Sequence, residues 1–105
     1  MSVLHIDEVN SFDNYIKNNN MVVVVFSASF CKPCREIYPY VEEIANTNKD
    51  IVFIKVDIEN GSEISDKFSI QSIPHFKFFK NGSEVGSFTG ANNQSILDAI
   101  AKLRK

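Results

Sequence analysis

Two cysteines supply the most reactive side chains in this sequence, and they stand close together as Cys31 and Cys34. With two residues between them at the start of an expected helix, their sulfurs share one turn and can form a reversible disulfide. The free N–H groups and partial positive charge of a helix N-terminus stabilise a thiolate at Cys31. Lys32 adds a neighbouring cation, and Pro33 suits the first turn because it lacks an N–H. The pattern predicts thiol–disulfide exchange with Cys31 as nucleophile and Cys34 as the resolving thiol.

A Cys-x-x-Cys motif by itself also fits two inert core cysteines or half of a zinc site. Zinc normally takes four protein ligands, and the sequence has neither a second cysteine pair nor a His-x₃₋₅-His motif. One of its two histidines, His75, could titrate near pH ~6.5 or bind a metal with the cysteines, whereas His5 is expected on an edge strand. We therefore expect no metal. A metal- or cluster-bridged dimer through Cys31, Cys34 and His75 is the least favoured alternative.

The elements that must position the cysteines are expected to be a buried strand and a helix. Residues 21–28 are rich in valine without alternation, which is typical of a central strand covered on both faces. A helix should run from the cysteines to about residue 46, because Ile37 and Val41 recur at helical spacing. Pro39 cannot donate to the carbonyl of Arg35, so this helix is predicted to bend there.

The rest of the chain reads as alternating strands and helices that end in a hairpin. Asn81 and Gly82 both tolerate positive φ, so they predict the hairpin turn. Strands separated by helices argue for parallel pairing, whereas the two hairpin strands must be antiparallel. The expected elements are strand 3–6, helix 8–18, strand 51–58, helix 62–68, strand 75–80, strand 84–89 and helix 93–105.

The predicted hairpin carries aromatic and charged side chains in turn. Aromatic residues in a strand usually bury, so a recognition platform is the less favoured interpretation. The phenylalanines expected in the core are Phe76, Phe78 and Phe79. The charged residues expected on the solvated face are Lys77, Lys80 and Glu84.

Length, composition and charge limit the class of protein. A chain of 105 residues with 44% hydrophobic residues fits one compact domain that buries its own core. The formal net charge of -2 gives no basic surface for nucleic acid or anionic lipid. The N-terminus lacks the pattern of a secretory signal, and the longest apolar run is far shorter than the ~20 residues that span a membrane. We expect a soluble, cytoplasmic monomer that binds neither nucleic acid nor membranes.

Beyond these patterns, the sequence resembles the thioredoxin family over nearly its whole length. The resemblance rests on several ordered features, and chance agreement at all of them is implausible. These features are Val23-Val24-Val25-Phe26-Ser27-Ala28 before Phe30-Cys31-Lys32-Pro33-Cys34, then Pro39, Val56-Asp57, Ile73-Pro74, Phe79-Lys80-Asn81-Gly82 and Gly90-Ala91-Asn92. The resemblance implies an α/β thioredoxin fold over residues 1–105, with a central mixed five-stranded sheet flanked by helices on both faces. It also implies a cis peptide bond before Pro74.

The resemblance further implies a protein-disulfide reductase that works through a reversible dithiol/disulfide pair, here Cys31 and Cys34. An extended partner chain would pair with the backbone of Ile73 beside Cys31. The implied groove residues are Phe30, Ile73, Pro74 and Gly90. Thioredoxins carry no bound cofactor, take electrons from NADPH through thioredoxin reductase, and commonly serve peroxiredoxins.

Four positions at the expected site depart from the family pattern. The tryptophan before the first cysteine is Phe30, which keeps an aromatic surface but lacks an indole N–H donor. The glycine between the cysteines is Lys32, whose charge favours the thiolate and should make the disulfide more oxidising. The common threonine after the cis proline is His75. Phe30, Lys32 and Pro33 are expected to tune the reactivity of the site.

The fourth departure is Val25, which stands where the family has a buried aspartate behind the second cysteine. The usual acceptor for the proton of Cys34 is then missing, and slower resolution is expected. Lys55 matches the lysine that neighbours that aspartate, so its head must reach solvent, meet Asp57 on the same strand face, or become neutral and accept the proton itself. The favoured alternative is a lysine stem packed under the site with its head in water.

The sequence therefore predicts a small oxidoreductase that reduces protein disulfides. One open alternative is a glutathione-coupled or oxidising, isomerase-like protein of the same fold, which Lys32 and Val25 make credible. The other is a redox-silent binding module, although the presence of both cysteines around a proline weighs against it.

Overall fold

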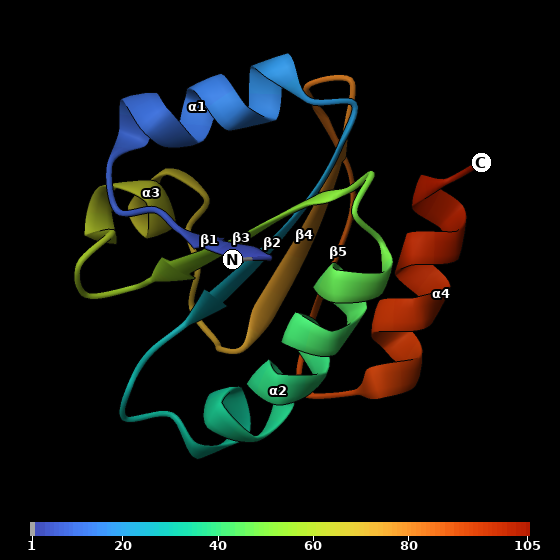
Figure 1. Ribbon diagram of the computed structural model, residues 1–105. Helices are drawn as coiled ribbons and strands as arrows, with labels where there is room; N and C mark the ends of the chain where they lie inside the picture. Colours follow the sequence, from blue (N-terminus) through green and yellow to red (C-terminus); the bar gives the residue numbers. More distant parts are fainter. Residues whose placement is uncertain (1) are drawn as a thin grey trace.

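A central sheet with helices on both of its faces forms the protein (Figure 1). The structure is a computed structural model and describes residues 2–105. The sheet has five strands in the order β1-β3-β2-β4-β5, which confirms the fold class expected from the sequence. The elements are β1 (Val3–His5), α1 (Val9–Asn18), β2 (Met21–Ser27), α2 (Lys32–Thr47), β3 (Val52–Asp57), α3 (Ser62–Lys67), β4 (His75–Lys80), β5 (Ser83–Thr89) and α4 (Asn93–Leu103).

Strand β2 lies at the centre of the sheet and leads into the cysteine motif. It pairs in parallel with β3, where Val24 stands opposite Ile54, and antiparallel with β4, where Val24 stands opposite Lys77. Every residue of β2 after Met21 is buried. Because strands cover both edges of β2 and helices cover both faces, an uninterrupted apolar run suits this position.

The direction of β4 departs from the expectation that strands separated by helices are parallel. Helix α3 lies between β3 and β4 in the chain, yet β4 is antiparallel to β2, which itself runs parallel to β3. Six helical residues advance the chain by only about 9 Å, which is too short to return it along the full length of a strand. The chain therefore re-enters the sheet at the end where β3 left it.

Two apolar layers, one on each face of the sheet, form the core. One layer lies between the sheet and helices α2 and α4, and it contains Phe76 and Phe78. The other layer lies under α1 and α3, and it contains Phe79. Side chains alternate between the faces of a strand, so the neighbours Phe78 and Phe79 bury in opposite layers. The prediction that all three phenylalanines are core residues is confirmed, since each is at most 4% exposed.

The hairpin between β4 and β5 confirms one prediction and contradicts another. Asn81 and Gly82 adopt φ values of 50° and 85°, as the predicted turn requires. Lys77, however, is 8% exposed rather than solvated. Its Nζ atom lies 2.9 Å from Oε2 of Glu84 and 5.4 Å from the centre of the Phe68 ring. The segment after α3 covers this face of β4, and the ion pair with Glu84 makes burial of the lysine tolerable.

Helix α2 continues through Pro39 from Lys32 to Thr47. Its apolar stripe, which includes Ile37 and Val41, faces the sheet as the spacing predicted. The bend at Pro39 stays a prediction. Within residues 2–105, no helix combines the length and apolar character needed to cross a membrane.

Candidate active site

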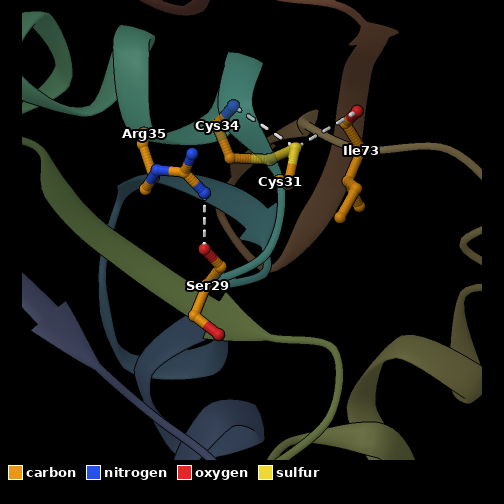
Figure 2. Close-up of a disulfide and its surroundings, with 5 residues drawn as sticks. All are labelled: Ser29, Cys31, Cys34, Arg35 and Ile73. Atoms are coloured by element: carbon orange, nitrogen blue, oxygen red, sulfur yellow. Dashed lines mark hydrogen bonds between the residues drawn. A yellow bond between two sulfur atoms is a disulfide. The ribbon is translucent and has the colours of Figure 1, made fainter.

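The cysteine motif lies where β2 ends and α2 begins. The backbone N–H of Cys31 donates to the carbonyl of Ala28 at 3.2 Å, which folds the connecting turn. Cys31 is the N-cap of α2, and its Sγ atom accepts the backbone N–H of Cys34 at 3.3 Å. That contact points a helix N-terminal donor at the sulfur, as Figure 2 shows. The same donor would stabilise a thiolate on Cys31 after reduction.

Cys31 and Cys34 form a disulfide, with their Cα atoms 5.3 Å apart. The two cysteines differ in accessibility, because Cys31 is 9% exposed and Cys34 only 3%. Cys31 is therefore the more accessible residue of the pair.

The segments expected to form the groove do meet beside Cys31. Its Sγ atom lies 3.9 Å from the carbonyl oxygen of Ile73, and the Ile73–Pro74 peptide bond is cis, as the resemblance implied. The N–H of Gly90 donates to the carbonyl of Pro74 at 2.8 Å. Phe30 is 67% exposed, the highest value among the large apolar side chains of residues 2–105. These residues place apolar side chains and the carbonyl of Ile73 around one sulfur.

Arg35 connects the first turn of α2 to the loop before the cysteines. Its Nη1 atom donates to the carbonyl of Ser29 at 2.7 Å (Figure 2). The guanidinium therefore lies beside the loop that carries Phe30 and Cys31, and it fixes that loop to the helix.

Behind the second cysteine, Val25 and Lys55 stand opposite each other on β2 and β3. Val25 is 3% exposed within the layer under α2, so no acidic side chain occupies its position. The Nζ atom of Lys55 lies over the Tyr38 ring, 4.5 Å from its centre. Asp57 instead accepts the backbone N–H groups of Glu59 and Asn60 through Oδ1, at 2.8 and 3.1 Å. The half-buried lysine thus packs its stem under the site, with its head over the Tyr38 ring, and the expectation that this head lies in water stays a prediction.

Tyr38 is a site residue that the sequence reasoning missed. It stands one helical turn after Cys34, and this i, i+4 spacing was the available signal. Its hydroxyl lies 3.0 Å from Nε2 of His5, and the Nζ atom of Lys55 lies over its ring. Burial raises the pKa of Tyr38, and the charge of Glu42 raises it further.

A cavity of about 230 Å³ reaches the buried second cysteine. Its lining includes the polar residues Ser27, Ser29, Arg35, Tyr38 and Lys55, and Cys34 forms part of its wall. No carboxylate lines this cavity.

The sequence left open a role for His75 as a metal ligand, but its side chain contacts other groups. Its Nδ1 atom lies 2.8 Å from Oγ1 of Thr89, and its ring packs against Phe26. No group of three or more His, Cys, Asp or Glu residues within positions 2–105 has the geometry to hold a metal ion.

The fold and the site together define a class of protein. A disulfide-forming cysteine pair at the start of a helix, beside a cis proline and at the end of a central strand, is the arrangement of a thiol–disulfide oxidoreductase. The family model described as thioredoxin matches residues 3–102. The chain belongs to the thioredoxin family.

Individual relatives agree with this assignment in sequence and structure. Thioredoxin 1 of Plasmodium falciparum is 44% identical over 91 residues, which cover 87% of this chain and 88% of that protein. A solved structure of Plasmodium falciparum thioredoxin superimposes with a TM-score of 0.90 at 40% identity, covering 94% of this chain and 97% of that one. Another solved structure, from work on thiol resolution in a yeast mitochondrial 1-Cys peroxiredoxin through glutathione and thioredoxin systems, has a TM-score of 0.92 at 26% identity, covering 96% and 95%.

Proposed function

We propose that this thiol–disulfide oxidoreductase works as a reductant of protein disulfides, with Cys31 as nucleophile and Cys34 as resolving thiol. The observation that carries the assignment of roles is the asymmetry of the pair. Cys31 is the more exposed residue and its sulfur accepts a helix N-terminal N–H, whereas Cys34 is almost fully buried. A nucleophile needs access and a stabilised thiolate, and a resolving thiol needs only to reach its neighbour.

The reaction proceeds through two successive thiol–disulfide exchanges. The Cys31 thiolate attacks one sulfur of the partner disulfide, forms a mixed disulfide and releases the second partner sulfur as a thiolate, which takes a proton. Cys34 then loses its proton and attacks the Cys31 sulfur, which releases the first partner sulfur and closes the Cys31–Cys34 disulfide. The partner gains two electrons and two protons, and the dithiol loses them. The cavity beside Cys34 supports a route for its proton through solvent, with Lys55 and Arg35 favouring the anionic sulfur.

The partner chain is proposed to bind along Ile73 and Phe30. The carbonyl of Ile73 lies close to the attacking sulfur, so backbone pairing there would bring a partner disulfide into line with Cys31. The exposed ring of Phe30 adds an apolar contact, and Pro74 and Gly90 shape the far side of the groove.

The electron donor and partners are proposed from family membership. Thioredoxin reductase, with electrons from NADPH, would re-reduce the disulfide, and peroxiredoxins are candidate oxidised partners. The peroxiredoxin work behind one similar structure supports the latter choice. We further propose that the protein acts in the cytoplasm as a monomer, without a bound cofactor.

Insulin reduction with NADPH and thioredoxin reductase tests the proposal. The unmodified protein should turn over, and Cys31→Ser should abolish turnover. Cys34→Ser should instead accumulate a mixed disulfide.

Turnover with glutathione but not with reductase would favour the glutathione-coupled alternative. A disulfide potential well above that of Plasmodium falciparum thioredoxin, measured in parallel, would favour the oxidising alternative. Lack of turnover with any donor would contradict the reductase assignment and favour a binding module.

A further inference from the structure

Among the side chains of residues 2–105, one buried polar atom has no hydrogen-bond partner, and it belongs to His75. The imidazole is anchored at one end only, where Nδ1 lies 2.8 Å from Oγ1 of Thr89. At the other end, Nε2 is inaccessible to solvent, and the neighbouring ring is that of Phe26, with centroids 6.3 Å apart. A buried polar atom without a partner costs stability, so its presence in a folded protein calls for an explanation.

The position of His75 links it to the groove. It directly follows Pro74, and its partner Thr89 directly precedes Gly90. His75 and Thr89 are also register partners on β4 and β5. The side-chain bond between them therefore supplements the backbone bond from Gly90 to Pro74, which measures 2.8 Å. Both bonds fasten the two segments that form the far side of the groove.

The surroundings of Nε2 favour the neutral form of the imidazole over the protonated one. When Nδ1–H donates to Thr89, Nε2 of the neutral ring is a hydrogen-bond acceptor without a partner. An unpaired acceptor costs less stability than an unpaired N–H donor would. Protonation would add an N–H donor and a positive charge at Nε2, a buried position with no partner to receive them. Burial lowers the pKa of His75, and the positive charge of Lys77 lowers it further. Glu84 on the neighbouring strand opposes that effect, and Phe26 on β2 contributes no charge.

We propose that neutral His75 is a positioning residue of the partner-binding groove, which it holds in shape through Thr89. Acid turns the charged ring away from Phe26 and loosens the Ile73–Pro74 segment against Gly90. Binding of extended polypeptide partners then weakens, while the exchange chemistry at Cys31 continues. The inference rests on the proposed function, because it assumes that this groove receives the partner chain.

The test compares two disulfides reduced by the prereduced protein in single turnovers, without reductase. One is a synthetic disulfide peptide that contains no His, Asp or Glu, and the other is hydroxyethyl disulfide, which is too small to use the groove. The ratio of the two rate constants cancels the ionisation of Cys31, which both reactions share. We expect this ratio to fall severalfold between pH ~7.5 and ~5 in the unmodified protein. In His75→Gln, whose amide can still donate to Thr89, the ratio should not change with pH.

Two further measurements keep the inference testable if His75→Gln folds poorly. Thr89→Val removes the anchor and should lower the ratio at every pH. In His5→Gln only one imidazole remains, so its NMR titration reports His75 directly and should lie below the ordinary histidine value. An equal pH dependence in the unmodified protein and His75→Gln would overturn the inference, and so would titration of His75 at or above about 6.5. Failure to reduce even hydroxyethyl disulfide would instead contradict the proposed function.

Discussion

At the scale of single residues, the charge next to Cys31 distinguishes this site. Lys32 is exposed and stands between the cysteines, where the family pattern has glycine. The backbone N–H of Cys34 stabilises the Cys31 sulfur by geometry that any residue at position 32 would allow. Lys32 adds a charge to this local contact. The side chain can therefore change reactivity without changing the fold.

Replacing Lys32→Gln should slow alkylation of reduced Cys31. Loss of an exposed positive charge weakens thiolate stabilisation by a modest amount, and we expect the rate with iodoacetamide at mildly acid pH to fall by a factor of about two to five. The measurement is made in a Cys34→Ser background, so that only Cys31 reacts. Lys49→Gln, at an exposed position outside the site, is the matched control and should leave the rate unchanged. An equal rate in both variants would contradict a role for Lys32.

At the scale of secondary structure elements, the connection from β3 to α3 depends on one close approach. Gly61 is buried at the N-cap of α3, and its N–H donates to the carbonyl of Asp57 at 2.7 Å. A Cβ atom on Gly61 would lie 2.9 Å from Cγ1 of Val56 and 3.0 Å from the carbonyl oxygen of Asp57. Backbone cannot move aside as a flexible side chain does. This glycine is needed for space in the turn that leads toward the Ile73–Pro74 segment.

Gly61→Ala should therefore lower the free energy of unfolding by about 1–3 kcal/mol, as expected for an overpacked site. Gly86→Ala is the matched control, because a Cβ atom there meets nothing within 4 Å. That control should change the free energy of unfolding by less than about 0.5 kcal/mol. Urea unfolding, followed by circular dichroism, measures both. Similar stabilities for the two variants would show that the turn relaxes around the added methyl group.

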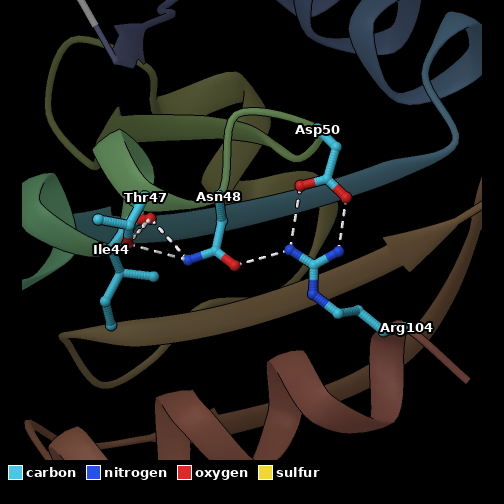
Figure 3. A network of polar contacts seen from close by, with 5 residues as sticks. All are labelled: Ile44, Thr47, Asn48, Asp50 and Arg104. Carbon is cyan, nitrogen blue, oxygen red and sulfur yellow. Dashed lines mark hydrogen bonds and ion pairs between the residues drawn. The ribbon is translucent and has the colours of Figure 1, made fainter.

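At the scale of the whole molecule, an ionic clamp joins the C-terminal end to the loop after α2. Arg104 contacts both carboxylate oxygens of Asp50, at 2.5 and 3.0 Å, and Oδ1 of Asn48 at 2.6 Å (Figure 3). Asn48 in turn donates to the carbonyl of Ile44 in the last turn of α2 at 2.9 Å. The clamp thus connects helices α2 and α4, which cover the same face of the sheet.

Arg104→Gln should lower the melting temperature at neutral pH, and the difference from the unmodified protein should shrink in acid, where the contact to the neutral Asn48 remains. Hydrogen bonds from Arg104 lower the pKa of Asp50 below its ordinary value of 3.8. The folded state therefore favours the charged carboxylate, so the stabilisation is complete above that ordinary value and is lost as pH falls through the lowered one. Melting temperatures of both proteins across this range test it, with Lys102→Gln as an exposed control on the same helix. A difference of the same size at neutral pH and in strong acid would contradict the ionic contribution of Asp50.

The sequence by itself determined the features that arise between near neighbours in the chain. Cys31 caps the helix that holds Cys34 because the donor and acceptor are three residues apart. The turn at Asn81 and Gly82 forms because those two residues tolerate positive φ. The apolar run of β2 likewise required a central position, since only a strand covered on both faces can bury every side chain. The family resemblance supplied the groove around Pro74, which no local pattern specifies.

Tertiary structure alone decided which distant residues meet. Lys77 is buried because Phe68 covers it from another segment. Lys55 meets Tyr38 because α2 packs on the face of the sheet to which Lys55 projects. The register of β5 determines the partner of His75. The direction of β4 also depended on how far α3 could carry the chain. A sequence pattern records which side chains can bury, but their partners depend on strand order and register, and these are settled only when the whole core packs.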